Sequence, residues 1–166
     1  MHVLHRIAVQ ADDKDMAFRT VKDYLENELN NYESWYDWFV TGGGRWNPNE
    51  GSQYNDDDQS MTISYAEEPD KFISEVNSAI EGRIEEFNQY RKSLADMDIN
   101  ASLDKYDGQM DFSFDLYPLG KMIDIMQGKW DFNSYFFDAT HETTNTKYML
   151  DKIDDSWYLV YVDFHF

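Results

Sequence analysis

The feature that most constrains the fold is an aromatic stretch that runs directly into three consecutive glycines. Residues 35–46 read Trp-Tyr-Asp-Trp-Phe-Val-Thr-Gly-Gly-Gly-Arg-Trp. Aromatic and β-branched residues favour a strand, and a strand that ends in glycines must turn sharply or let another group approach its backbone closely. We therefore expect a strand that ends in a tight turn at Gly42–Gly44, with Arg45 and Trp46 directly after it.

Hydrophobic periodicity predicts the other elements. Residues 3–9 alternate with a period of two, which indicates a strand with one buried face. Apolar side chains recur every three or four positions in three segments, which predicts helices. The acidic cluster at 12–15 supplies a cap for the first helix, and Pro69 opens the second, which is about 27 residues long. The expected elements are strands at 3–9, 35–41, 60–66, 134–141, 147–153 and 157–166, and helices at 16–30, 69–95 and 118–127.

The order of these elements predicts the fold class. Helices and strands are partly segregated along the chain, which is typical of a two-layer α+β sandwich. The first five elements match most of a ferredoxin-like βαββα unit. We expect a single domain over residues 1–166, in which residues 1–97 form the ferredoxin-like part. Residues 110–166 then form a short helix and a C-terminal antiparallel β-meander, after a polar connection.

The charge of the chain limits its partners. Thirty-three acidic residues against 14 basic residues give a formal net charge of -19. Such a field repels nucleic acid and anionic membrane surfaces and attracts basic surfaces, so direct binding of DNA or RNA is not expected. No stretch approaches 18 apolar residues, so no membrane span is expected. The absence of cysteine excludes disulfides and thiolate chemistry and fits the predicted cytoplasmic location.

Acidic side chains form a candidate surface for a protein partner. The helix at 69–95 and the loop before it present carboxylates that can follow one another as phosphates do along a duplex. A partner with a basic nucleic-acid-binding surface would fit them, whereas the alternative is an ordinary solvated surface. The residues of this acidic face are Glu75, Glu81, Glu85, Glu86, Asp56, Asp57 and Asp58.

Two Asp/His groupings form a candidate metal site. Asp138 and His141 fall in one late strand, and Asp163 and His165 in another. If these strands are neighbours, the four side chains supply oxygen and nitrogen ligands for a divalent metal. The alternative is that they are polar groups at strand ends. No other cofactor is expected.

Arg45, Trp38 and Trp46 form a candidate ligand site. Arginine can clamp a carboxylate or phosphate, and indole rings can stack on a base. The alternatives are that Arg45 neutralises Asp37 and that the tryptophans fill the core. The chain contains no P-loop, Rossmann fingerprint or nucleophile elbow. A binding protein is therefore expected rather than an enzyme.

The segment Tyr36–Trp46 resembles small, mostly uncharacterised proteins of phages and mobile elements, which carry an aromatic-Asp-Trp strand followed by Gly-Gly-Arg-Trp. The ending Val160–Phe166 is similar to the closing strand of that group, which carries Asp-x-His. A related plasmid and phage family has a Trp-Gly-Thr-Lys-Trp version and is described as ferredoxin-like. The present chain departs from the motif by one additional glycine before Arg45. The resemblance implies a phage or mobile-element origin and the host cytoplasm as location.

Charge and resemblance together suggest two functions. The first is an inhibitor of a host defence nuclease, such as a CRISPR effector or a restriction enzyme, whose basic channel is occupied by the acidic face as a nucleic-acid mimic. The second is a protein that binds a nucleotide or phosphate ester, or a metal-dependent hydrolase, at the Asp/His groupings and Arg45.

Overall fold

The computed structural model describes residues 2–31, 34, 36–98, 117–126, 136–138 and 150–165. Contacts group the chain into two compact units. The first comprises Met1–Ile80 and Asn133–Phe166, and the second comprises Glu81–Phe132.

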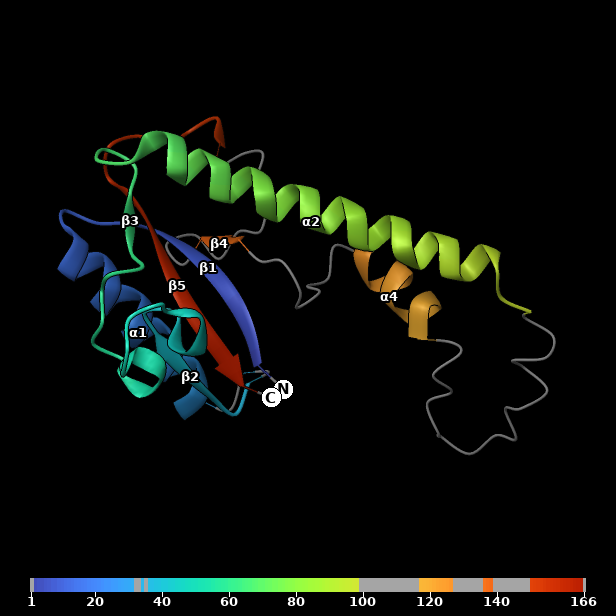
Figure 1. The fold of residues 1–166 in the computed structure, drawn as a ribbon, viewed down its shortest axis with the longest axis horizontal. Coiled ribbons are helices and arrows are strands. Elements are labelled where there is room, and N and C mark those ends of the chain that lie inside the picture. Colours follow the sequence, from blue (N-terminus) through green and yellow to red (C-terminus); the bar gives the residue numbers. More distant parts are fainter. Residues whose placement is uncertain are drawn as a thin grey trace. The chain divides into compact units, whose positions relative to one another are not determined.

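The first unit is built on a mixed β-sheet with the strand order β2-β5-β1-β4 (Figure 1). The strands β1 (His2–Gln10) and β5 (Trp157–His165) pair antiparallel over their whole length. The short strand β4 (Phe136–Asp138) pairs parallel with the other edge of β1. The strands β2 (Trp38–Thr41) and β3 (Ile63–Ser64) both pair antiparallel with β5.

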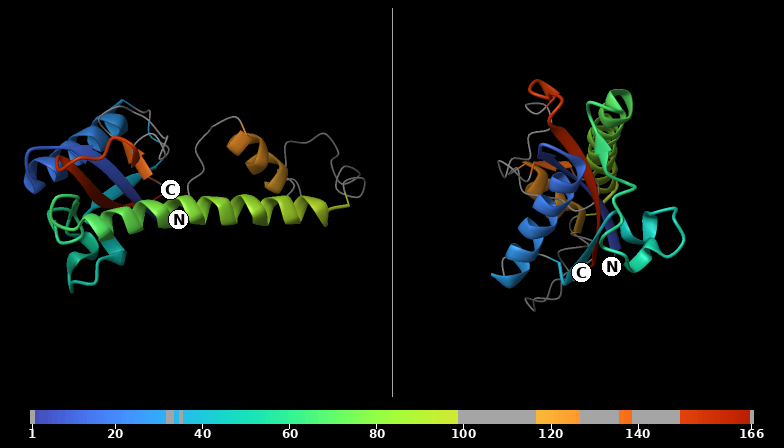
Figure 2. Two further views of the ribbon diagram at one scale, coloured as in Figure 1. Left: turned by 90° about the horizontal axis from the view of Figure 1, so that it is seen from above. Right: turned by 90° about the vertical axis from the view of Figure 1, so that its left-hand side faces the viewer.

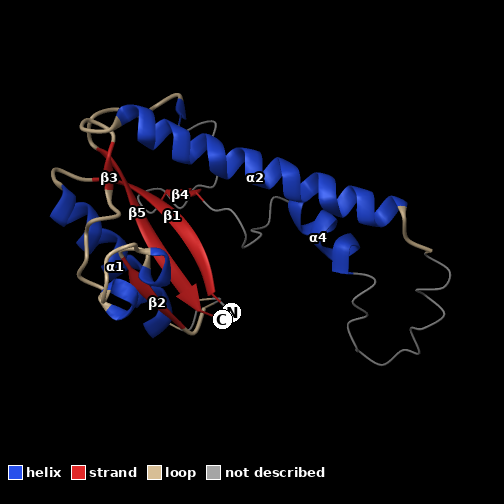
Figure 3. Cartoon of the chain, in the orientation of Figure 1, coloured by secondary structure: helices blue, strands red, loops and turns tan. Residues whose placement is uncertain are grey.

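Because β1 occupies one edge of β5, β2 and β3 must share the other edge. β2 lies beside the C-terminal half of β5 and β3 beside its N-terminal half. The chain between them, residues 42–62, leaves the sheet edge and returns to it, and contains two short 3₁₀ turns at Gly44–Trp46 and Ser52–Tyr54 (Figure 3).

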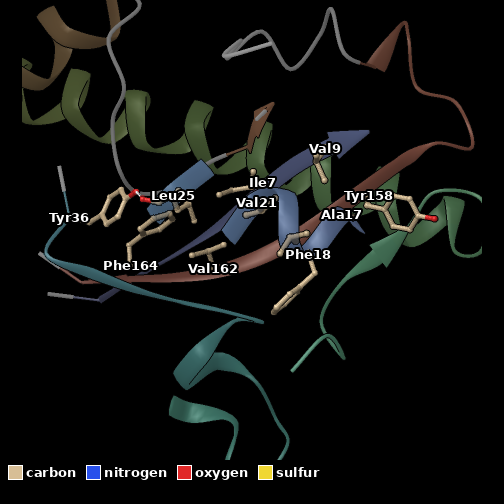
Figure 4. Packing of buried hydrophobic residues seen from close by; sticks show 11 residues of the cluster. Ile7, Val9, Ala17, Phe18, Val21, Leu25, Tyr36, Tyr158, Val162 and Phe164 are labelled. Atoms are coloured by element: carbon tan, nitrogen blue, oxygen red, sulfur yellow. Dashed lines mark hydrogen bonds between the residues drawn. The ribbon is translucent and has the colours of Figure 1, made fainter. Parts of the chain in front are cut away.

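Helices cover both faces of the central strands, as the two views of Figure 2 show. Helix α1 (Lys14–Asn30) packs its apolar stripe on one face, where Val21 and Leu25 contact a cluster that includes Ile7 and Phe164 (Figure 4). The first turns of α2 (Pro69–Ala95) place Phe72 on the opposite face. Every residue of β5 from Trp157 to Phe164 is therefore buried, which gives a near-continuous apolar strand.

The predicted helices are confirmed. Asp13 caps α1 by accepting a hydrogen bond from the Met16 amide at 2.7 Å. Helix α2 begins at Pro69 and is 27 residues long. Helix α4 (Tyr117–Met126) lies in the second unit with the C-terminal part of α2, where the rings of Tyr90 and Tyr117 are 6.2 Å apart.

The α+β class is confirmed, whereas the ferredoxin-like order is not, because β2 and β3 pair with β5 and not with each other. The C-terminal β-meander is wrong. β4 and β5 lie on opposite edges of β1, and residues 150–153 form no strand. Leu150 and Ile153 instead pack together on the second core cluster, because a spacing of three suits one side of a turn. Strands from both predicted parts, residues 1–97 and 110–166, belong to one sheet.

Candidate functional site

Three aromatic side chains form a row across one end of the sheet. His2, His165 and Trp38 occupy directly opposite positions on β1, β5 and β2, so their side chains leave the sheet on the same face. The indole of Trp38 stacks on the His165 ring, with centres 5.0 Å apart and planes at 10°. The His2 ring stands edge-on to both, at 5.0 Å from His165 and 5.2 Å from Trp38. The three residues thus lie in a row across the strands, while their ring centres form a nearly equilateral triangle.

A buried carboxylate lies beside this row. Asp163 precedes His165 by two residues on β5, and its side chain is 1% exposed. One carboxylate oxygen lies 3.0 Å from His2 Nδ1, and the other accepts a hydrogen bond from the Arg45 amide at 3.2 Å. Because an ionised carboxylate can only accept, the His2 Nδ1 proton must be the donor. In the neutral form of His2, this tautomer has its free lone pair on Nε2.

The glycine turn explains how Arg45 reaches Asp163. The amides of Gly42 and Gly43 both donate to the Tyr161 carbonyl, at 2.8 and 2.9 Å. All three glycines have positive φ, of 85°, 85° and 49°, a region that other residues enter at a cost. A Cβ on Gly44 would lie 2.5 Å from Asp163 Cβ. The tight turn predicted from the sequence is confirmed, and its glycines let the backbone lie directly on β5.

The side chains that follow the turn are accessible. Trp46 is 39% exposed, and its ring centre lies 6.4 Å from that of His2. The exposed guanidinium of Arg45 lies 5.9 Å from the Trp46 ring, in a cation–π arrangement. The alternative pairing of Arg45 with Asp37 is not found. Among the described residues Asp37 instead lies 3.5 Å from His165 Nδ1, and no carboxylate there forms an ion pair with Arg45.

Asn47 braces the loop that carries this turn. Its side-chain amide donates to the Gly42 carbonyl at 2.9 Å, and to Asp58 and Ser60, both at 3.1 Å. On the other side of the loop, Lys22 from α1 forms ion pairs with the two preceding aspartates, residues 56 and 57. The loop is thus fastened to the sheet edge and to α1 by polar contacts.

Farther along the same face of the sheet, Glu75 of α2 contacts residues of β1 and β5. It accepts a hydrogen bond from Arg6 Nε at 2.6 Å, and the Arg6 guanidinium lies over the Tyr161 ring. Burial works to raise the pKa of Glu75, but hydrogen bonds from Tyr161 and Arg6 outweigh it, so the pKa lies below its usual value. Burial, together with the neighbouring Glu75, raises the pKa of Tyr161.

Most residues of the predicted acidic face have partners among the described residues. Glu75 lies at the border of the buried stripe, three residues after Phe72, and is paired with Arg6. Glu86 accepts a hydrogen bond from the Tyr90 hydroxyl at 2.7 Å, and the three loop aspartates have the partners given above. Only two members are exposed and have no partner among the described residues, namely Glu81 and Glu85.

The predicted metal ligands are also only partly brought together. Asp163 and His165 share the site described above, but β1 lies between β4 and β5, so the condition that the two strands are neighbours is not met. Asp138 is opposite Ala8 and Asp163 is opposite Leu4, a separation of about 13 Å along β1. His141 lies outside the described residues. In the part of the chain that is described, no three His, Asp or Glu side chains are grouped to hold a metal ion.

The sequence-based prediction missed His2. Its signal was non-local: β1 and β5 are both nine residues long, and a full antiparallel pairing of the two places His2 opposite His165.

Comparisons with family models, curated proteins and solved structures found no match. No helix in the described ranges is both long and apolar enough to cross a membrane.

Proposed function

We propose that the first unit binds a small ligand that combines an anionic group with a planar ring, such as a nucleotide or an aromatic phosphate ester. The observation that carries this proposal is Arg45. In a chain of formal net charge -19, its exposed guanidinium pairs with no carboxylate of the described residues and lies against an indole instead. A cation in such a setting is available to an anion from solution.

The aromatic rings around Arg45 are suited to stack on the planar ring of such a ligand. Trp46 is partly exposed, and the row of Trp38, His165 and His2 lies close by. Stacking of a base on an aromatic side chain contributes about 1–3 kcal/mol, and a guanidinium can hold a phosphate through two parallel hydrogen bonds. The acidic field of the rest of the chain disfavours a polynucleotide, which carries many phosphates. A ligand with one or two anionic groups avoids most of that repulsion.

The test is a titration with adenosine 5′-monophosphate in buffer that contains EDTA, followed by tryptophan fluorescence and calorimetry. We expect Arg45→Ala to weaken binding at least tenfold. The matched control is Arg19→Ala, which removes the same charge from an exposed arginine that is paired with Asp15 on α1. Equal losses in the two variants would mean that only the overall field matters, and absence of binding to the unmodified chain would refute the proposal.

A second candidate, inhibition of a host defence nuclease by an acidic surface, is supported by the net charge and by the exposure of Glu81 and Glu85. These lie one helical turn apart on α2. Its test is whether the chain blocks DNA cleavage by a CRISPR effector or restriction enzyme, with less effect at high salt. Reversal of both glutamates to lysine should abolish inhibition. Reversal of Asp23 and Glu26, exposed residues of α1, changes the net charge equally and should not.

The phage or mobile-element origin and the ferredoxin-like relationship remain part of this second proposal. The support for the fold relationship is the chain order of strand, helix, strand, strand and helix. The support for the origin is the resemblance of the segments around Trp38 and His165.

A further inference from the structure

The two imidazoles of the aromatic row have the separation of two ligands on one metal ion. His2 and His165 are direct cross-strand partners, and their ring centres are 5.0 Å apart with planes at 71°. A Zn–N bond is about 2.0–2.1 Å, and the ring centre lies about 1.1 Å beyond the nitrogen, so two ligands at a tetrahedral angle have ring centres roughly 5.2 Å apart. The observed spacing of the ring centres is close to this value.

Each imidazole also has a carboxylate near Nδ1, but only that of His2 is hydrogen-bonded to it. Asp163 lies at 3.0 Å from His2 Nδ1, and Asp37 lies at 3.5 Å from His165 Nδ1, an enclosed nitrogen without a hydrogen bond among the described residues. Histidines that bind metals usually place a carboxylate on the nitrogen away from the metal, because it fixes the tautomer and makes the ligand nitrogen more basic. For His2 this leaves Nε2 as the ligand atom, and for His165 the enclosure of Nδ1 leaves Nε2 as the candidate ligand atom.

We propose that His2 and His165 bind a divalent transition-metal ion such as Zn²⁺ through Nε2, with Asp163 orienting the His2 ring. The side chains are 19% and 32% exposed, so an ion can enter from solvent. No third protein ligand is grouped with them in the described residues, so the remaining coordination positions are open to water or to an anionic ligand. The site differs from the set predicted from the sequence, because His2 takes the place of Asp138 and His141 and because Asp163 orients a ligand instead of binding the ion.

The inference does not depend on the proposed nucleotide binding, because the imidazoles can hold an ion whether or not Arg45 holds an anion. The experiment is a calorimetric titration of the tag-free, metal-free chain with Zn²⁺ in the absence of nucleotide. We expect one ion per chain, and at least tenfold weaker binding in both His2→Ala and His165→Ala. Asp163→Asn should weaken binding 10–100-fold, as loss of an orienting carboxylate does. His141→Ala should leave the affinity unchanged.

Two further measurements separate ligand loss from misfolding and from weak binding by surface carboxylates. Circular dichroism reports the fold of each variant, and His165→Gln replaces the imidazole while keeping a polar side chain of similar length. Electron paramagnetic resonance of the Cu²⁺-loaded chain should show coupling to two nitrogens, and to one after His2→Ala. The proposal is overturned if the unmodified chain binds no Zn²⁺, if a folded His2→Ala variant binds it unchanged, or if His141→Ala abolishes binding.

Discussion

Gly42→Ala tests why the turn needs glycine at this position. Glycine either leaves room for the neighbouring backbone or only permits the positive φ. Gly42 has φ of 85°, and a Cβ there would overlap the Asp58 carbonyl oxygen and lie 3.1 Å from its carbon. These are backbone atoms of a loop held by Asn47, so they cannot move aside as a flexible side chain does. Gly51 is the matched control, because its φ is 88° and a Cβ would meet nothing within 4 Å.

Gly42→Ala and Gly51→Ala change the free energy of unfolding through the same contributions, except that only Gly42→Ala creates a steric clash. A left-handed conformation costs an L-residue about 1–2 kcal/mol, and Ala restricts the unfolded chain enough to return about 0.4–1 kcal/mol. Gly51→Ala should therefore lower the free energy of unfolding by about 0–1.5 kcal/mol. Overpacking adds about 1–3 kcal/mol at Gly42 alone. In a chain of 166 residues, each 1 kcal/mol shifts Tm by roughly 2–4 °C.

Urea and thermal unfolding of both variants, followed by circular dichroism and tryptophan fluorescence, measure this difference. We expect Gly42→Ala to be less stable than Gly51→Ala by about 1–3 kcal/mol, the overpacking cost. If the two variants lose the same stability, the turn does not approach Asp58 as closely as described, and the glycines serve only the backbone conformation.

Three further predictions concern polar groups around the core. Asn47→Ala removes the donor to the buried Gly42 carbonyl, and urea unfolding should show a loss of about 1–3 kcal/mol. The Tyr36 hydroxyl donates to a backbone carbonyl of α1, and burial raises its pKa. The unfolded chain loses this phenol proton near its ordinary pKa of about 10, while the folded chain retains it. The stability of the unmodified chain should thus fall more steeply above that pH than that of Tyr36→Phe. Because the pKa of Glu75 is lowered in the fold, its contribution is present above the unfolded pKa of about 4.3 and lost as pH falls through the folded value. Unfolding across an acid pH series should show a smaller loss for Glu75→Gln, and an unchanged profile would mean that the Arg6 contact contributes nothing.

Local sequence patterns predicted the bounds of the helices well. The order of the strands in the sheet depends on pairing between distant segments, which no local pattern shows. The Asp13 cap and Pro69 mark helix starts within one turn of chain. The partner of both β2 and β3 lies about a hundred residues away in β5. The three-residue β4 pairs with β1, although its sequence fits an antiparallel meander equally well. The strand order is determined by long-range packing, so it could not be predicted from the pattern of apolar residues.

The candidate site shows the same division. The sequence indicates two candidate segments, one with Trp38, Arg45 and Trp46 and the other with Asp163 and His165. The pairing of β2 with β5 brings the two segments together. The histidine that completes the site is a single residue in a strand pattern, without a motif around it. Asp138 and His141 formed a motif as good as Asp163 and His165, so sequence spacing alone could not distinguish the pair that meets the aromatic row.

The three glycines and the buried carboxylate depend on each other. Asp163 is the one carboxylate in a strand that is otherwise buried and mostly apolar, and burial of such a group is costly unless its oxygens are satisfied. Its partners are the His2 ring and the Arg45 amide, and the amide reaches it only because Gly44 has no Cβ. An apolar residue at position 163 would fill the space but would not hold a proton on His2 Nδ1. The buried carboxylate therefore orients the His2 imidazole, which packing alone does not require. For this reason we expect ligand binding by the imidazole at this end of the sheet.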